Sequence, residues 1–124
     1  MIRPYSEIYQ DDILAIWLQT NISAHPYISR QIWKELLPAM KDALPRAKIW
    51  MEMGKSYVQG FIGVEAPHHI AGLFVLMENQ CNGVGSGLVK FVQEQYPRLT
   101  LDVFVRNTGA IAFYTRYGFV TISE

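Results

Sequence analysis

The first half of the chain contains two stretches in which apolar residues recur at helical spacing. One runs from about residue 11 to residue 20, and the other runs from residue 30 to residue 44. Ser29 stands directly before the second stretch, where its hydroxyl can accept a backbone N–H as a helix N-cap. Pro38 lies inside that stretch, and because proline lacks a backbone donor we expect it to kink or divide the helix. The pattern predicts two consecutive helices.

In the middle of the chain, the spacing of apolar residues changes from the helical period to one typical of β-strands. After a short first strand at residues 1–5, the sequence predicts strands at residues 48–53, 57–65 and 69–76, rich in β-branched and aromatic side chains. The strand at residues 69–76 is an almost continuous apolar run. Such runs are typical of a central strand that is covered on both faces.

The last third of the chain alternates between the two patterns. We expect a helix that ends near Tyr96, a strand at residues 98–105, a helix at residues 107–118 and a last strand at residues 119–123. The order strand–helix–strand implies a crossover and locally parallel pairing. The whole order predicts a single α/β domain over residues 1–124, with a central mixed sheet flanked by helices.

Composition narrows the class of protein. The 11 basic and 11 acidic side chains give a formal net charge of zero, so the chain has no bulk attraction for nucleic acid or an anionic membrane. No apolar run reaches the length of a membrane span, and the first 12 residues contain no apolar core of signal-peptide length. Cys81 is the only cysteine, which excludes an internal disulfide, and no cysteine cluster suggests a metal. We expect a cytoplasmic protein without nucleic acid, membrane or metal partners.

Three alternating glycines, Gly83, Gly85 and Gly87, stand where a helix should begin. Glycine lets an anion approach the free N–H groups of a helix start, although a tight turn packed against the sheet would need the same residues. A Walker A loop is excluded, because Leu88 and Val89 replace the lysine and the serine or threonine that it requires. A dinucleotide fingerprint also fits poorly, because the third of its glycine positions is not met.

Two motifs together carry a resemblance to a known family. Residues 80–85 read QCNGVG and match Q-x-x-G-x-G, while residues 107–119 read NTGAIAFYTRYGF and match N-x-x-A-x-x-x-Y-x-x-x-G-F. With these two motifs in this order along the chain, the sequence resembles the GNAT superfamily of acetyl-CoA-dependent N-acetyltransferases, especially its small stand-alone bacterial members. The resemblance covers nearly the whole chain and implies the GNAT fold. It also implies a strand beyond residue 124, so we expect the usual C-terminal strand to be missing. Either the sequence is a truncated product, or a neighbouring subunit fills the gap by pairing with the edge strand at residues 119–123, which would form a homodimer.

The resemblance implies a site for acetyl-CoA as the acetyl donor. The glycine-rich helix start would take the pyrophosphate, the strand before it would pair with the pantetheine arm, and Asn107 would contact that arm or cap its own helix, or both. The implied cofactor-binding residues are Leu73, Phe74, Val75, Gln80, Cys81, Asn82, Gly83, Val84, Gly85, Ser86, Gly87 and Asn107. Many relatives carry a basic residue where this chain has Cys81, so we expect weakened phosphate binding.

Tyr114 is the catalytic residue that the resemblance implies. It would protonate the departing thiolate as a general acid, which a phenol of pKa about 10 can do for a thiol of pKa about 8.5. From its apolar neighbours alone, Tyr114 could instead be a core aromatic residue. The acceptor would be a primary amine of a small molecule, peptide or protein, and it would attack directly. A non-catalytic acyl-CoA-binding or regulatory module is the alternative function.

The residues on the acceptor side are less well defined. Candidates for the group that deprotonates the amine are Glu52, Glu65, His68 and His69, and each could equally be a surface or turn residue. His25 and Tyr27 lie in the connection between the first two helices, which borders the acceptor cleft in the implied fold. We therefore take His25, Tyr27 and Glu65 as candidate substrate-side residues. Pro26 offers a structural alternative, a loop of fixed shape.

Overall fold

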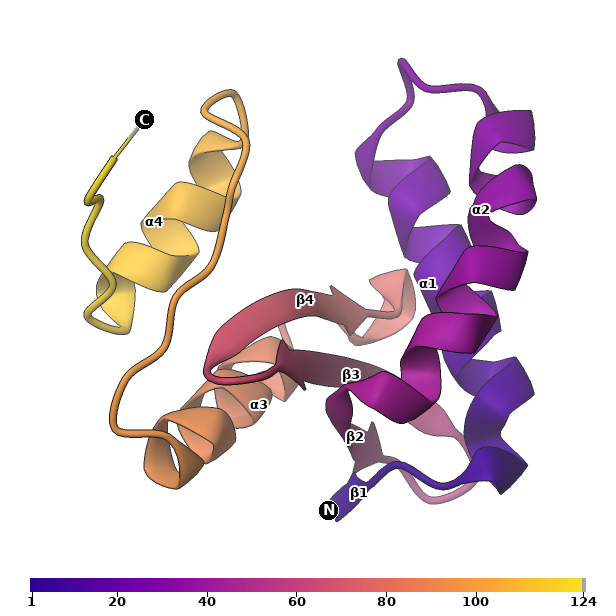
Figure 1. The fold of residues 1–124 in the computed structure, drawn as a ribbon, viewed down its shortest axis with the longest axis horizontal. Helices are drawn as coiled ribbons and strands as arrows, with labels where there is room; N and C mark the ends of the chain where they lie inside the picture. Colours follow the sequence, from indigo (N-terminus) through magenta and orange to yellow (C-terminus); the bar gives the residue numbers. More distant parts are fainter. Residues whose placement is uncertain (124) are drawn as a thin grey trace.

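The computed structural model describes residues 1–123 and contains a four-stranded sheet (Figure 1). Its strands are β1 (Ile2–Pro4), β2 (Lys48–Met53), β3 (Val58–Glu65) and β4 (His69–Val75). They lie in the order β1-β2-β3-β4, and each neighbouring pair is antiparallel. The four strands confirm the strand pattern predicted for the first 76 residues to within a few residues.

Helices pack on both faces of this sheet. They are α1 (Gln10–Ala24), α2 (Arg30–Ala43), α3 (Val84–Gln95) and α4 (Thr108–Arg116), with 3-10 turns at Glu7–Tyr9, Leu44–Arg46 and Met77–Asn79. In Figure 1, α1 and α2 form one side of the molecule, and α4 forms the other, with the sheet and α3 below the gap. Within residues 1–123, no helix is long and apolar enough to cross a membrane.

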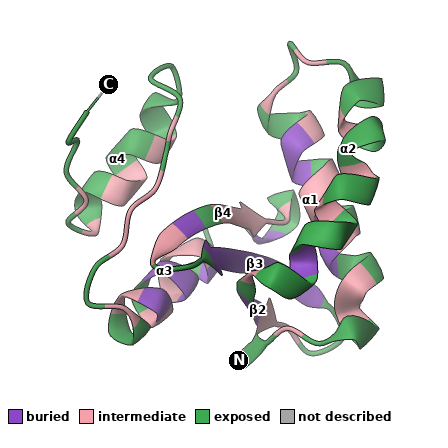
Figure 2. Cartoon of the chain, viewed as in Figure 1, coloured by how far each residue is buried: buried purple, intermediate pink, exposed green. Residues whose placement is uncertain are grey.

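The core has two apolar layers, one on each face of the sheet. Successive side chains of a strand point to opposite faces. Phe61 accordingly packs in the layer that contains Ile13 of α1, and Ile62 packs in the layer that contains Leu88 and Val92 of α3. Buried residues concentrate in β3, α1 and α3, whereas α2 and α4 contain none (Figure 2). β3, with α1 on one face and α3 on the other, therefore forms the most deeply buried part of the described chain.

The start of α2 confirms one local prediction, and its interior corrects another. The Ser29 hydroxyl accepts the Ile32 N–H at 3.4 Å, which makes Ser29 the N-cap. The helix runs from Arg30 to Ala43 through Pro38, so the expectation that Pro38 divides it is wrong. Proline removes one backbone bond from a helix, and the remaining turns on either side keep theirs.

The strand at residues 69–76 is not central, contrary to the expectation from its apolar run. β4 lies at the edge of the sheet, and β3 is the strand covered on both faces. The expected strand at residues 98–105 does not form. Its only pairing is one parallel bridge between His69 and Thr100, so the predicted parallel crossover is reduced to a single contact. An apolar run alone cannot supply the backbone partner that makes a strand.

The expected last strand at residues 119–123 does not form either. Val120 and Ile122 are 80% and 84% exposed, which leaves this segment without a partner for its apolar side chains. The expected homodimer depended on a strand edge here. Residues 119–123 provide no such edge, and the dimer stays a prediction. Glu124 lies outside the described residues.

Candidate functional site

The carboxyl end of β4 presents an open backbone edge. Leu76 N–H donates to Gln59 C=O at 3.0 Å, and in an antiparallel pair the bonds to the neighbouring strand involve alternate residues. The N–H groups of Leu73 and Val75 therefore point away from β3. Within residues 1–123, the backbone on that side bonds to β4 only where Ile70 N–H meets Thr100 C=O, at 2.8 Å. After Ile70, β4 has no further backbone hydrogen bond to the segment that contains Thr100 in the described part of the chain.

The loop before α3 turns sharply at the end of this open edge. Cys81 and Gly83 both have positive φ, 67° and 84°, and Gly83 is the N-cap of α3. The first bond of the helix joins Gly87 N–H to Gly83 C=O at 2.9 Å. The N–H groups of residues 84–86 consequently have no partner within the helix, as at any helix start. Together with the helix dipole, they provide a positive concave backbone surface.

Gln80 connects this loop to the strand. Its Nε2 donates to the Val75 carbonyl at 3.1 Å, which satisfies one backbone acceptor of the open edge with a side chain. The first position of the Q-x-x-G-x-G motif thus fixes the geometry between β4 and the start of α3.

α4 lies opposite the open edge, and Asn107 is its N-cap. The Asn107 Oδ1 accepts the Ala110 N–H at 3.1 Å, so the side chain caps the helix. Phe119 N–H returns to the Tyr114 carbonyl at 3.2 Å after Gly118, whose φ of 91° favours glycine. These two turns fix where α4 begins and ends, and hence which residues face β4.

Tyr114 is the most perturbed titratable group of the site. Its ring meets Phe113 at 5.1 Å and Phe119 at 5.5 Å between centroids, both edge to face. Burial disfavours the phenolate and raises the pKa of Tyr114 to about 12. The hydroxyl therefore keeps its proton at neutral pH by a wider margin than the ordinary phenol pKa implies.

A cleft of about 540 Å³ lies between the β4 edge, the α3 start and α4. Its lining residues are Leu73, Val75, Gln80, Cys81, Gly83, Gly85, Ser86, Asn107, Ala110, Phe113, Tyr114 and Arg116. Most of them are residues that the sequence singles out. Ala110 is a matched position of the second motif, whereas Phe113 was not selected, although it is the direct neighbour of Tyr114. Arg116 adds a positive charge that no motif indicated.

Several of the predicted cofactor-binding residues lie elsewhere. Phe74 packs against Phe61, 5.0 Å between centroids, in the layer that faces α1. Val84 is buried in the layer beneath α3, and Gly87 does not line the cleft. Asn82 lines a second cavity on the other side of the glycine loop. Only some residues of the strand and the loop, such as Leu73, Val75, Gly83 and Gly85, therefore line the cleft.

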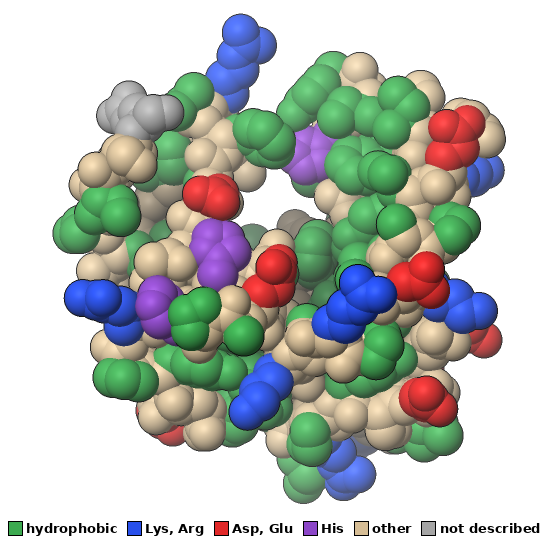
Figure 3. Space-filling model, viewed as in Figure 1, with side chains coloured by type: hydrophobic (Ala, Val, Ile, Leu, Met, Phe, Trp, Pro, Cys, Tyr) green, Lys and Arg blue, Asp and Glu red, His purple; other side chains and the backbone are tan. Residues whose placement is uncertain are grey.

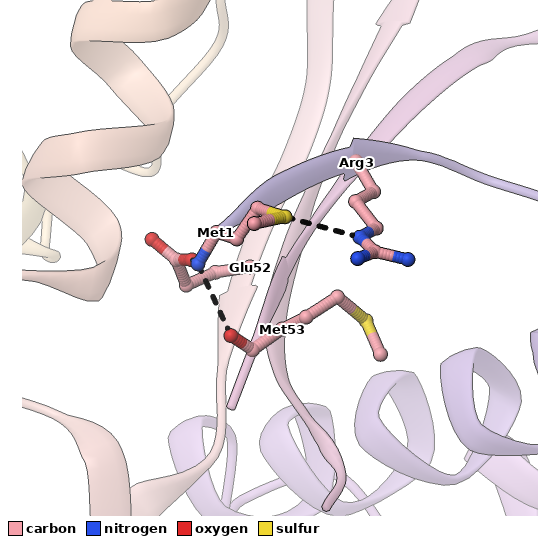
Figure 4. Close-up of polar contacts among 4 residues, drawn as sticks. All are labelled: Met1, Arg3, Glu52 and Met53. Atoms are coloured by element: carbon pink, nitrogen blue, oxygen red, sulfur yellow. Dashed lines mark hydrogen bonds and ion pairs between the residues drawn. The ribbon is translucent and has the colours of Figure 1, made fainter. Parts of the chain in front are cut away.

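Glu52 belongs to that second cavity, of about 530 Å³. Its Oε2 pairs with the amino group of Met1, which also donates to the Met53 carbonyl at 3.2 Å (Figure 4). Arg3 Nε contacts Met1 Sδ at 3.3 Å in the same group. The Glu52 carboxylate is thus engaged with an ammonium group, outside the residues that line the cleft between β4 and α4.

The remaining candidate proton acceptors gather where β3 turns into β4. Exposed Glu65 pairs with His69 across the strands. His69 Nδ1 lies 2.7 Å from Thr100 Oγ1, and its Nε2 lies 3.4 Å from Asp102 Oδ2. His68 Nδ1 is buried without a hydrogen-bond partner in the described part of the chain. Asp102 is a further charged residue that the sequence reading did not select.

His25 and Tyr27 lie together in the loop between α1 and α2. The Tyr27 hydroxyl is 3.0 Å from His25 Nδ1, and the His25 ring stacks on Trp33 at 5.5 Å between centroids. The His25 ring also meets Phe104 at 5.9 Å. Phe104 belongs to the segment that precedes α4, so this contact joins the two sides of the molecule.

Comparisons with known proteins agree with this geometry. Residues 20–124 match the family model described as an acetyltransferase (GNAT) domain. The chain is 34% identical over 122 residues to the peptidyl-lysine N-acetyltransferase YiaC of Escherichia coli strain K12, covering 96% of this chain and 82% of YiaC. It is 28% identical over 110 residues to the peptidyl-lysine N-acetyltransferase YjaB of the same strain, covering 88% and 74%.

Solved structures extend the comparison to the fold. The solution structure of apo YjaB from Escherichia coli matches 97% of this chain and 82% of its own length, with 27% identity and a TM-score of 0.82. The PaiA N-acetyltransferase of Thermoplasma acidophilum, solved in complex with coenzyme A, matches 100% and 92% with a TM-score of 0.87. Its 15% identity shows a shared fold alone. The chain belongs to the GNAT family of acetyl-CoA-dependent N-acetyltransferases.

Proposed function

We propose that this chain transfers the acetyl group of acetyl-CoA to the side-chain amine of a lysine in a peptide or protein. The observation that carries the proposal is the open backbone edge of β4, which faces Tyr114 across a cleft that ends at the glycine loop. The relatives YiaC and YjaB, both named peptidyl-lysine N-acetyltransferases, support the choice of acceptor.

The cleft fits the donor in chemistry and shape. The free N–H groups at the start of α3 would hold the pyrophosphate, and Gly83 leaves room for it, since a Cβ there would meet nothing within 4 Å. The N–H groups of Leu73 and Val75 would pair with the amide groups of the pantetheine arm. Asn107 would contact the arm while it caps α4.

Arg116 supplies the charge that the loop lacks. The family resemblance leads us to expect a basic residue at the position of Cys81, and residues 81–87 contain none. Arg116 lines the same cleft, with its guanidinium 5.8 Å from the centre of the Phe113 ring. An arginine can pair with phosphate through two hydrogen bonds, so we assign Arg116 to the phosphates of the donor.

The residues of the cleft divide the chemical step between them. A backbone N–H of the β4 edge would donate to the thioester oxygen, where negative charge develops as the amine attacks. The amine nitrogen forms a bond to the acetyl carbon while the carbon–sulfur bond breaks, and the amine releases its proton to solvent or to a nearby base. Tyr114 would donate its phenolic proton to the departing sulfur and regain one from solvent.

A direct assay tests this proposal. The protein is mixed with acetyl-CoA and a peptide that contains one lysine, and thiol release is measured beside the mass of the peptide. We expect both signals together, and neither with a peptide in which arginine replaces the lysine. If the protein binds coenzyme A in a calorimetric titration but acetylates no lysine peptide, polyamine or amino acid, the chain is a non-catalytic acyl-CoA-binding module instead.

A further inference from the structure

The two sides of the molecule meet at an aromatic contact above the sheet. His25 comes from the loop between α1 and α2, and Phe104 comes from the segment that leads into α4. Their rings lie edge to face with 5.9 Å between centroids. Figure 3 shows the surface hollowed between the two sides, with hydrophobic side chains and a histidine meeting above the hollow. We call the His25–Phe104 pair the aromatic bracket.

The His25 half of the bracket is held in place from several directions. Its ring stacks on Trp33 at 29°, and the Trp33 ring in turn meets Trp17 of α1 at 5.8 Å. The Tyr27 hydroxyl is hydrogen-bonded to His25 Nδ1, and His25 N–H donates to the Asn21 carbonyl at 3.0 Å. The orientation of this ring is therefore set before any substrate arrives.

The Phe104 half is connected to the cofactor cleft. The Phe104 carbonyl accepts the N–H of Asn107 at 2.9 Å, and Asn107 both lines the cleft and caps α4. Phe104 is nevertheless 69% exposed, so most of its ring is accessible to another molecule. The backbone of Phe104 is thus anchored beside the cleft, while its ring stays outside the core.

The rim of the hollow has the charge that an ammonium group requires. Asp102 precedes Phe104 by two residues, and its side chain is 97% exposed beside His69. Exposed Glu65 lies opposite His69 in the register of β3 and β4, and it adds a second carboxylate to this region. Figure 3 shows acidic and histidine side chains at the rim, with basic side chains farther out. Carboxylates next to aromatic rings attract an alkylammonium through ion pairing and cation–π contacts.

We propose that the aromatic bracket is the acceptor port of the enzyme and selects its substrate. It admits the unbranched stem of a lysine side chain, which passes below the two rings, and it excludes amines carried on bulky rings. The lysine stem has four flexible carbons that end in a compact ammonium, which can contact the aromatic rings of the bracket. The inference rests on the proposed function and adds the residues that define the acceptor.

The test compares two acceptors in wild type and variants. Initial rates with acetyl-CoA are measured for a lysine peptide and for an aminoglycoside, in the wild type and in Phe104→Ala, His25→Ala and Phe104→Tyr. Val105→Ala is the matched control, because Val105 is the neighbouring residue and is 66% exposed. The Kd for coenzyme A, measured by calorimetry, checks that each variant retains its fold and cofactor cleft.

We expect Phe104→Ala and His25→Ala to raise KM for the lysine peptide roughly 2- to 30-fold, as the loss of a cation–π contact implies. Acetylation of the aminoglycoside rises at the same time, with kcat for the peptide and the Kd for coenzyme A unchanged. Phe104→Tyr keeps an aromatic ring at this position and should restore most of the selectivity that Phe104→Ala loses. Val105→Ala behaves as the wild type does.

Two negative results have different meanings. If the wild type acetylates the lysine peptide but Phe104→Ala leaves both KM and selectivity unchanged, the acceptor port is wrong and the proposed function stands. If the wild type binds coenzyme A and acetylates neither acceptor, the proposed function itself is overturned, and the port with it.

Discussion

The two walls of the cofactor cleft are built in different ways. The wall formed by β4 and α3 rests on the core, where Ile62, Leu88 and Val89 are fully buried. The α4 wall contains no buried residue and packs through the half-buried rings of Phe113, Tyr114, Tyr117 and Phe119. Its hydrogen bonds to α3 are few, among them Gln93 Nε2 to the Tyr117 carbonyl at 2.8 Å and the Tyr117 hydroxyl to Ser86.

In the proposed function, this difference would separate the binding of the donor from the delivery of the proton. The backbone N–H groups proposed to hold the pyrophosphate and the arm belong to the deeply packed wall, while Tyr114 and Arg116 belong to the peripheral one. Local stability follows the number of buried apolar contacts. We therefore expect α4 to open more readily than α3, and a donor bound between the two walls to stabilise α4.

The largest effect is expected from Tyr114→Phe, which removes the hydroxyl of the peripheral wall. We expect kcat to fall about 10²- to 10⁴-fold, because the departing thiolate loses its general acid. The Kd for coenzyme A should hardly change, since the ring and the other contacts stay. Tyr96→Phe, next to α3, is the matched control and should leave kcat as it is. An unchanged kcat in Tyr114→Phe would remove Tyr114 from the mechanism.

Substitutions of apolar residues in each wall measure how much each wall contributes to stability. Leu88→Ala creates a cavity beneath α3 and should lower the free energy of unfolding by about 2–5 kcal/mol. Phe113→Ala should cost less, because Phe113 is only half-buried, and should instead weaken coenzyme A binding. Urea unfolding and calorimetric titration of both variants measure these effects. Equal losses of stability would show that α4 belongs to the same cooperative core as α3.

The raised pKa of Tyr114 predicts how stability depends on alkaline pH. Its pKa is about 12 in the folded chain and about 10 in an unfolded one, so the unfolded state releases the proton first as the pH rises. The stability that burial of the neutral phenol provides is complete below pH about 10. It is lost by about pH 12, up to about 3 kcal/mol. Urea unfolding across this range should show a smaller decline in Tyr114→Phe. Parallel curves would mean that the phenol is not buried in solution.

The smallest effect concerns the cap of α4. Asn107→Ala should lower the free energy of unfolding by about 1 kcal/mol, because the Ala110 N–H loses its partner. Asn107→Asp keeps an oxygen in that place and should retain most of the stability. If the Asn107 side chain also contacts the pantetheine arm through its amide, both variants should bind coenzyme A more weakly. Weakening in Asn107→Ala alone would assign Asn107 to capping only.

The sequence alone predicted the elements that depend on neighbours along the chain. The period of the apolar residues located α1, α2 and the strands up to β4, and Ser29 was recognisable as a cap before the structure. The two motifs indicated the family, and most of the residues they marked line one cleft. These features depend on local hydrogen bonds and on spacing, which a sequence contains directly.

Only the tertiary structure decided where separate segments meet. Apolar runs predicted a central β4 and strands at residues 98–105 and 119–123, but a strand exists only where another backbone pairs with it. For the same reason, the sequence did not indicate that Arg116 lines the cleft. His25 and Phe104 are likewise far apart in the sequence, although their rings are in contact. The pKa of Tyr114 likewise depends on burial among other segments. Pairing, proximity and desolvation are properties of the folded chain, so no local pattern could supply them.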